Sequence, residues 1–295
     1  MFMEKSKVYF IKDITKENIV KIYDALGVKL KGKVGVKVHS GEKGNQNFLK
    51  PEFLSDIINH VNGTVVECNT AYEGARNTTD KHSKLMEEHG WSKLYDVDIL
   101  DSDEDLVLEM PNGKVIKKNY VGKKITNYDS MLVLSHFKGH PMGGYGGALK
   151  QLSIGFASSY GKGYIHCLGD EEWTEEKMFQ VDQTKFLEAM ADAASSVISM
   201  FQGNIVYINI MCNMSVDCDC CYIAEDPCMK DIGILASLDP VALDQACIDL
   251  VYNSKDEGRD HLVERIESRN GIHTIEAASD LNIGSREYEL VDISD

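Results

Sequence analysis

KVGVKV at Lys33–Val38, PEFLSDIINHV at Pro51–Val61 and TVVEC at Thr64–Cys68 form the stretch that decides the fold. The first and last segments are short runs rich in valine, which is typical of strands. The middle segment begins with proline, which is favoured in the first turn of a helix. The order strand, helix, strand predicts two parallel strands joined by a right-handed helical crossover.

The same alternation continues on both sides of this stretch. We expect further strands at Lys7–Ile11, Val97–Leu100, Ser130–Ser135, Asn204–Met211, Asp231–Ala236 and Arg286–Val291, and further helices at Thr15–Leu26, Thr79–Gly90, Ala148–Ser158, Glu175–Phe201, Pro240–Tyr252 and near the C-terminus. Strands that alternate with helices predict an α/β fold with a mainly parallel sheet flanked by helices.

One segment departs from the alternation. Leu106–Met110 and Lys114–Asn119 flank the tripeptide Pro111-Asn112-Gly113, and Asn-Gly between two such runs is typical of a β-hairpin. We therefore expect a small antiparallel hairpin insert at about 104–121. The chain has only 5 prolines and no repeat or low-complexity linker, which favours a single α/β domain over 1–295.

Composition excludes several kinds of partner. The 295 residues carry 47 acidic and 31 basic side chains, a net charge of -16, which argues against nucleic acid and anionic membranes as partners. No stretch approaches the roughly 20 apolar residues of a membrane span. Met1–Lys7 becomes charged at once and does not resemble a secretory signal. We expect a cytoplasmic protein with reduced thiols, and no segment fixes its oligomeric state.

Polar residues follow four of the expected strands. His39, Asn69, His136 and Cys218 come shortly after a strand, and parallel strands share a carboxyl edge where ligands gather. We therefore expect these four residues to line one pocket. Neutral histidines can bind a metal or shuttle a proton, so His39 and His136 are candidate catalytic residues. Lys150 is a third candidate and would attract a small anionic ligand.

A glycine-rich loop precedes the helix that carries Lys150. Gly143, Gly144, Gly146 and Gly147 let backbone N–H groups approach a ligand, and a helix N-terminus favours an anion. These glycines are therefore candidate cofactor-binding residues. The loop matches neither the phosphate-binding loop nor the dinucleotide fingerprint. The alternative is a tight turn packed under its own helix.

Four cysteines, Cys218, Cys220, Cys221 and Cys228, form a cluster of candidate metal ligands. Thiolates suit zinc, iron and iron–sulfur clusters, but a zinc knuckle requires two C-x-x-C pairs. Neighbouring aspartates raise thiol pKa values unless a cation is bound. We expect at least two of the first three cysteines to contact a metal, with His39 or His136 as a further ligand. A buried thiol pair and a disulfide are the alternatives.

Long motifs resemble a known family. They are Val38–Glu42, Ser135–Lys150, Asp217–Cys221 and Asp231–Asp244, and they resemble the family called domain of unknown function 362, often labelled "uncharacterised iron–sulfur centre protein". The resemblance spans nearly the whole chain and implies an iron–sulfur cluster, but no settled activity. Many members carry a ferredoxin-like insert between the glycine loop and the cysteine cluster. This chain is a short member without that insert, since Cys167 is the only cysteine between Lys150 and Met211.

Three functions remain open at this point. The first is a metal- or iron–sulfur-associated protein, in one form a redox enzyme, that binds a small anion at the carboxyl edge of its sheet. The second is a metal-free enzyme of the isomerase or racemase type that uses histidine and lysine for acid–base chemistry. The third is a non-catalytic metal- or ligand-binding protein.

Overall fold

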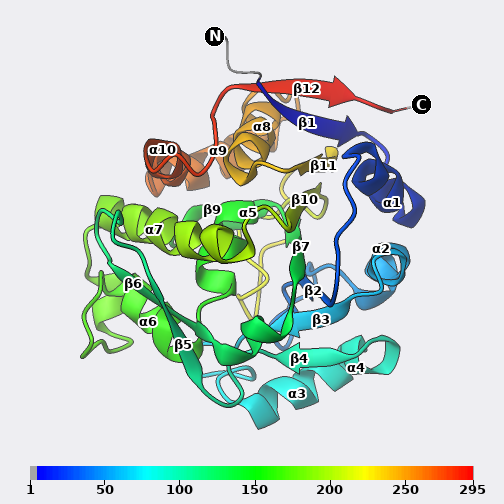
Figure 1. Cartoon of the computed structure of the whole chain (residues 1–295). Coiled ribbons are helices and arrows are strands. Elements are labelled where there is room, and N and C mark those ends of the chain that lie inside the picture. The colour runs from blue at the N-terminus through cyan, green and yellow to red at the C-terminus, as the bar shows by residue number, and fades with distance from the viewer. Residues whose placement is uncertain (1–4, 295) are drawn as a thin grey trace.

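A central sheet of eight strands organises the computed structural model, which describes residues 5–294 (Figure 1). The strands in spatial order are β12 (Tyr288–Asp292), β1 (Ser6–Ile11), β11 (Gly233–Ser237), β10 (Ile205–Met211), β7 (Ser130–His136), β2 (Val34–Lys37), β3 (Thr64–Glu67) and β4 (Val97–Ile99). All neighbouring strands are parallel except at β11, which runs antiparallel to both β1 and β10. The expected α/β fold with a mainly parallel sheet is confirmed.

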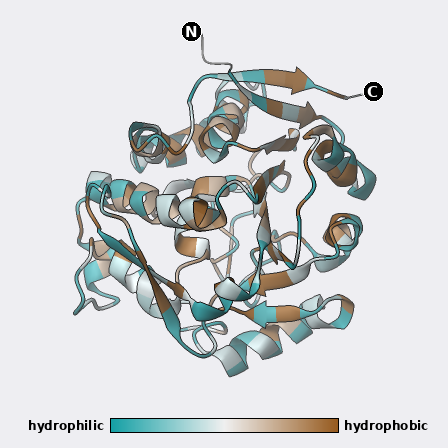
Figure 2. Ribbon diagram, viewed as in Figure 1, coloured by the Kyte–Doolittle hydropathy of each residue, from teal (hydrophilic) through white to brown (hydrophobic). Residues whose placement is uncertain are grey.

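Helices cover both faces of the sheet (Figure 1). One core lies between the sheet and α1 (Lys16–Ala25), η1 (Pro51–Leu54), α2 (Ser55–His60), α3 (Thr79–Glu88) and α4 (Trp91–Leu94). The other lies between the sheet and α5 (Ala148–Lys150), α7 (Gln183–Phe201), α8 (Pro240–Tyr252), α9 (Arg259–Ser268) and α10 (His273–Asp280). Along β7, Leu132 and Leu134 belong to the first core and Met131 and Val133 to the second, as the alternation of side chains along a strand requires. Hydrophobic residues are accordingly frequent along the central strands, as the brown stretches of the ribbon show (Figure 2).

The expected antiparallel hairpin is present as β5 (Asp105–Glu109) and β6 (Lys118–Gly122). Its second strand begins later than the predicted Lys114. The carboxylate of Asp192 in α7 accepts hydrogen bonds from the backbone N–H groups of Lys114, Val115 and Ile116. This distant carboxylate holds the connection as a loop, so Asn-Gly does not form a tight two-residue turn.

Other boundaries also differ from the sequence prediction. The helix expected from residue 175 begins only at Gln183, where Asp182 caps the N–H of Lys185, and the segment before it contains only the short turn η4 (Lys177–Phe179). The single helix expected at Ala148–Ser158 is not continuous. The short α5 passes into a π-helical turn, η3 (Gln151–Gly155), and a separate helix, α6 (Ser159–His166), follows. The short turn η2 (Lys123–Asn127) leads from β6 into β7.

Two further findings concern membrane-spanning helices and the N-terminal segment. Among residues 5–294, no helix combines the length and the apolar character needed to cross a membrane. The N-terminal segment that we compared with a secretory signal lies partly outside the described residues.

Candidate functional site

A cavity of about 350 Å³ opens at the carboxyl ends of β2, β3 and β7. Its wall includes Lys37, His39, Glu67, Arg76, His140, Lys150, Lys162, His166, Cys220 and Cys221. Two of the predicted catalytic residues, His39 and Lys150, therefore lie on the wall. Asn69 does not, because its side chain contacts His82 and Thr79 instead.

The cavity carries more positive than negative side chains. Four cations, Lys37, Arg76, Lys150 and Lys162, line it together with two carboxylates, one of which, Glu175, is exposed. Lys162 is buried, and its Nζ donates to the backbone oxygen of Ala157 at 2.5 Å. Burial lowers the pKa of Lys162. In a protein with a net charge of -16, this local surplus favours a small anion.

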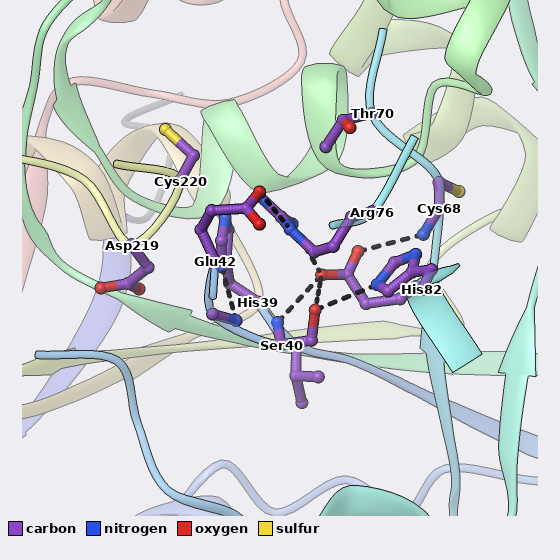
Figure 3. Close-up of polar contacts among 12 residues, drawn as sticks. His39, Ser40, Glu42, Cys68, Thr70, Arg76, His82, Asp219 and Cys220 are labelled. Carbon is purple, nitrogen blue, oxygen red and sulfur yellow. Dashed lines mark hydrogen bonds and ion pairs between the residues drawn. The ribbon is translucent and has the colours of Figure 1, made fainter. Parts of the chain in front are cut away.

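A buried ion-pair network fixes the floor of the cavity (Figure 3). Glu67 accepts hydrogen bonds from Lys37 Nζ at 2.8 Å and from the backbone N–H of Ser40 at 2.9 Å. Arg76 Nε donates to Glu42 at 3.1 Å, and its guanidinium also lies 3.8 Å from Glu67. Burial raises the pKa of Glu67, but the charge of Lys37 and its other cationic neighbours hold it well below its usual range. The network joins the loops that follow β2 and β3.

Asp219 anchors the cysteine segment. Its buried carboxylate lies 3.0 Å from His136 Nδ1 and 2.8 Å from Lys138 Nζ, and its backbone oxygen accepts from the N–H of Glu42 at 2.8 Å. Burial raises the pKa of Asp219, but the charges of His136 and Lys138 outweigh this and lower it. The neighbouring Cys220 is thereby held at the cavity wall, whereas Cys218 is buried and, like His136, does not line this cavity.

His136 does not have the free nitrogen expected of a catalytic base or metal ligand. Its Nε2 lies 2.6 Å from the backbone oxygen of Cys212, and its Nδ1 faces the Asp219 carboxylate. Both partners are acceptors, so both ring nitrogens donate and neither keeps a lone pair. His136 therefore acts as a positioning residue behind the cysteines.

The metal-ligand cluster is only partly the predicted one. Ligand atoms of His140, Cys218 and Cys220 lie within 4.8 Å of one another, so this group could hold a metal ion. Cys221 lines the cavity beside it. Cys228 lies apart, with its Sγ 3.1 Å from the backbone oxygen of Met214. A four-cysteine iron–sulfur cluster therefore does not fit the described residues, whereas a single ion with two thiolate ligands does.

Protein cations neutralise the charges around the thiols. Asp219 is paired with Lys138, and Arg265 lies 3.1 Å from Asp217. Lys150 Nζ lies 3.8 Å from Cys218 Sγ. Burial raises the pKa of the Cys218 thiol, but the hydrogen bond from Cys220 and the charge of Lys150 hold it well below its ordinary value. Side-chain cations therefore already offset the effect of the neighbouring aspartates on the thiols, which the sequence suggested a bound cation would offset.

Two cavity histidines have opposite proton arrangements. His140 Nδ1 accepts hydrogen bonds from the N–H groups of Met142 and Gly143, so the neutral ring carries its proton on Nε2, 3.8 Å from Cys220 Sγ. His166 Nδ1 instead donates to the backbone oxygen of Lys162 at 2.7 Å, which leaves a lone pair on Nε2. Burial lowers both pKa values to about 4, so both rings are neutral at pH 7.

The glycine loop forms a small hairpin, β8 (Lys138–His140) and β9 (Gly144–Gly146), rather than an open anion-binding loop. The buried carboxylate of Asp244 accepts hydrogen bonds from the N–H groups of Ala148 and Leu149, so the helix start already holds an internal anion. A Cβ on Gly147 would lie 2.5 Å from this carboxylate. Gly144 has a φ of 81° and packs against Gly271. Tight packing therefore accounts for these two glycines, as the alternative interpretation of the loop proposed.

A family model described as Domain of unknown function (DUF362) matches residues 34–249, which include every residue of the site described above except Arg265 and Gly271. The chain belongs to the DUF362 family. The lactate racemase apoprotein from Thermoanaerobacterium thermosaccharolyticum has 13% identity and a TM-score of 0.44, over 98% of this chain and 83% of that chain. A structural-genomics protein from Thermotoga maritima has 10% identity and a TM-score of 0.43, over 92% of this chain and 60% of that one. No curated protein matches the sequence.

Several residues of this DUF362 site were missed by sequence reasoning. His166, Lys162 and Arg76 line the cavity, and Asp219 and Asp244 position parts of it. His166 and Lys162 lie on α6, a glycine-rich helix whose hydrophobic periodicity is weak. Their spacing of four residues, which places the Lys162 carbonyl beneath the imidazole, was the available signal.

Proposed function

We propose that this DUF362 protein is an enzyme that transfers a proton on a small organic anion, as an isomerase or racemase does. The observation that carries the proposal is His166: it has an unprotonated Nε2, lies on the cavity wall and is surrounded by a surplus of cations. An imidazole with a free lone pair can act as a general base, and an anion bound beside it would raise the His166 pKa from about 4 toward the operating pH. The cavity volume of about 350 Å³ suits a small ligand.

Two lysines supply the anion-binding charge. Lys150 and Lys162 form no salt bridge with a carboxylate in the described part of the chain, unlike Lys37 and Arg76. A ligand carboxylate or phosphate would give both ammonium groups an oxyanion partner in addition to the Cys218 sulfur and the Ala157 carbonyl that they already contact. Bound beside them, a C–H group next to a carbonyl would lose its proton to His166 Nε2, and its electron pair would move onto the carbonyl oxygen.

The same cavity contains groups that can return the proton. Cys220 keeps its proton, because hydrogen bonds with Cys218 and Cys221 raise its pKa well above the ordinary value. His140 presents an N–H at Nε2. A base and two donors in one cavity form the acid–base pairing that isomerisation requires.

Solvent deuterium exchange tests the proposal. The protein is incubated in D2O with panels of small carboxylates and phosphate esters, and ¹H NMR follows the C–H signals next to their carbonyl groups. We expect one class of compound to lose this signal in a protein-dependent way, with heat-denatured protein as the control. If native protein exchanges none of the panels, the proposal fails.

The metal-associated protein remains a second candidate, favoured by the convergence of His140, Cys218 and Cys220. A ligating histidine normally donates its other N–H to an acceptor, but His140 Nδ1 accepts instead, which weighs against it as a ligand.

Elemental analysis of protein purified without oxygen tests the metal. A metal-dependent protein should hold roughly one equivalent, lose it in Cys220→Ala, and keep it in the matched control Cys228→Ala, since Cys228 lies apart. Less than roughly a tenth of an equivalent in the wild type would exclude this candidate.

A further inference from the structure

A second, much smaller cavity of about 10 Å³ adjoins the first, and we call it the inner compartment. Eight residues line it: His39, Ser135, His136, Lys138, Gly146, Gly147, Lys150 and Gln151. His39 and Lys150 also line the larger cavity, so the two spaces share a wall. A volume of this size holds about one atom of the size of a water oxygen.

Ser135 presents a polar group with no partner. Its side chain is buried, with 3% of the residue exposed, and its Oγ has no hydrogen-bond partner among the described residues. A buried hydroxyl that makes no hydrogen bond costs free energy. An acceptor in the inner compartment would complete its hydrogen bonding.

Most other polar groups of the inner compartment are donors, and the amide of Gln151, which also lines it, offers both a donor and an acceptor. Lys138 and Lys150 are ammonium groups on its wall; the first also pairs with Asp219 at 2.8 Å, and the second lies 3.8 Å from Cys218 Sγ. His39 Nδ1 accepts from the N–H of Gly41 at 3.1 Å, so the neutral ring carries its proton on Nε2. Burial keeps this ring neutral, because it lowers the pKa of His39 well below its usual value. No carboxylate lines this space within residues 5–294.

Gly146 keeps the space between the two lysines open. A Cβ at this position would lie 3.7 Å from Lys150 Cδ and 3.8 Å from Lys138 Nζ, which is ordinary contact. Its φ is outside the left-handed region, so the backbone does not require glycine here. The residue matters because it has no side chain to fill the compartment.

We infer that the inner compartment is an oxyanion site that receives one negatively charged atom beside Ser135, Lys138 and Lys150. That atom is an oxygen of the ligand in the larger cavity or, without ligand, a halide ion. The inference rests on the proposed function and deepens it: the carbonyl oxygen that gains charge when the proton leaves would lie here. Donors arranged where charge develops stabilise a transition state more than the ground state.

Bromide is the probe for this site. Crystals of the full chain are soaked in sodium bromide, and anomalous differences are measured at the bromine absorption edge. We expect a peak in contact with Ser135 Oγ and Lys150 Nζ in the wild type and its loss in Gly146→Ala. The matched control is Gly74→Ala, whose Cβ would also make an ordinary contact, 3.6 Å from Glu42 Oε2, outside the compartment. It should keep the peak.

A second variant guards against misfolding of the first. Ser135→Ala removes the unpartnered hydroxyl without adding volume, so it should weaken the bromide peak while its melting temperature stays close to that of the wild type. No peak in the wild type would overturn the inference. A peak that persists unchanged in Gly146→Ala would show an adventitious ion only and would overturn it as well.

The test is independent of catalysis. Bromide binding requires no turnover, so a peak in a protein that exchanges no substrate would preserve the site and refute the proposed enzyme. Exchange activity without a bromide peak would support the proposed enzyme and refute the oxyanion site. Where both hold, a substrate found by exchange should displace bromide, which separates a ligand oxygen from a free halide as occupant.

Discussion

Replacing Asp244 by alanine should lower the free energy of unfolding by at least about 3 kcal/mol. The buried carboxylate accepts hydrogen bonds from the N–H groups of Ala148 and Leu149, from Asn209 Nδ2 at 2.7 Å and from the Tyr145 hydroxyl at 3.1 Å. Without it, several buried donors lose their acceptor at once, and each unpaired donor costs about 1–3 kcal/mol. Urea unfolding followed by circular dichroism measures the loss.

Two further variants make this result specific. Asp244→Asn keeps the volume and one acceptor oxygen, so it should be less destabilising than alanine but still clearly weaker than the wild type. Asp249 lies on the same helix at a partly exposed position, and its side chain accepts hydrogen bonds from Gln245 and Tyr288. Asp249→Ala should therefore lower the free energy of unfolding by less than about 1 kcal/mol. If Asp244→Ala unfolds at the urea concentration of the Asp249 variant, Asp244 does not hold α5 to α8.

Replacing His166 by asparagine should reduce proton exchange about a hundredfold or more, without lowering the melting temperature markedly. The variant loses the Nε2 lone pair, which no other described cavity histidine supplies: His140 and His39 carry their protons on Nε2. The rate of deuterium incorporation into the substrate found by NMR is the measurement. His60→Asn is the control, because His60 is 39% exposed in its side chain and pairs with Asp24 far from the cavity.

The pH profile gives this role a second signature. Burial lowers the pKa of His166 to about 4, and the base form is the one above the pKa. The specificity constant kcat/KM should therefore fall as pH falls through about 4 rather than 6.5. A bound anion stabilises the imidazolium, so the acid limb of kcat should lie at a higher pH than that of kcat/KM. An unchanged exchange rate in His166→Asn would refute His166 as the base.

Local patterns in the sequence were sufficient for most of the architecture. β-Branched runs and helix-start signals such as Asp239-Pro240 act over a few residues, and the strands and helices they indicate are present. The antiparallel direction of β11 was not predictable. A strand buried on both faces has the same hydrophobic pattern in either direction, and only its partners β1 and β10 decide which one it takes.

The sequence by itself determined that polar residues gather at the carboxyl edge of the sheet, and it identified His39, Lys150, Cys218 and Cys220 as residues of that region. Their chemical roles depend on contacts made across the chain. Asp219 meets His136 from 83 positions away, and Asp244 meets Ala148 from 96.

Only the tertiary structure decided which histidine could act as a base. His136, His140 and His166 are the same residue type, but their neighbours place their protons differently. The ring of His136 faces a carboxylate and a carbonyl, Nδ1 of His140 faces two N–H groups, and Nδ1 of His166 faces a single carbonyl. A ring nitrogen donates or accepts according to the group that faces it, and folding brings those groups together from distant segments. The sequence therefore determined which residues are present at the sheet edge, and the packing of the loops decided what each of them can do.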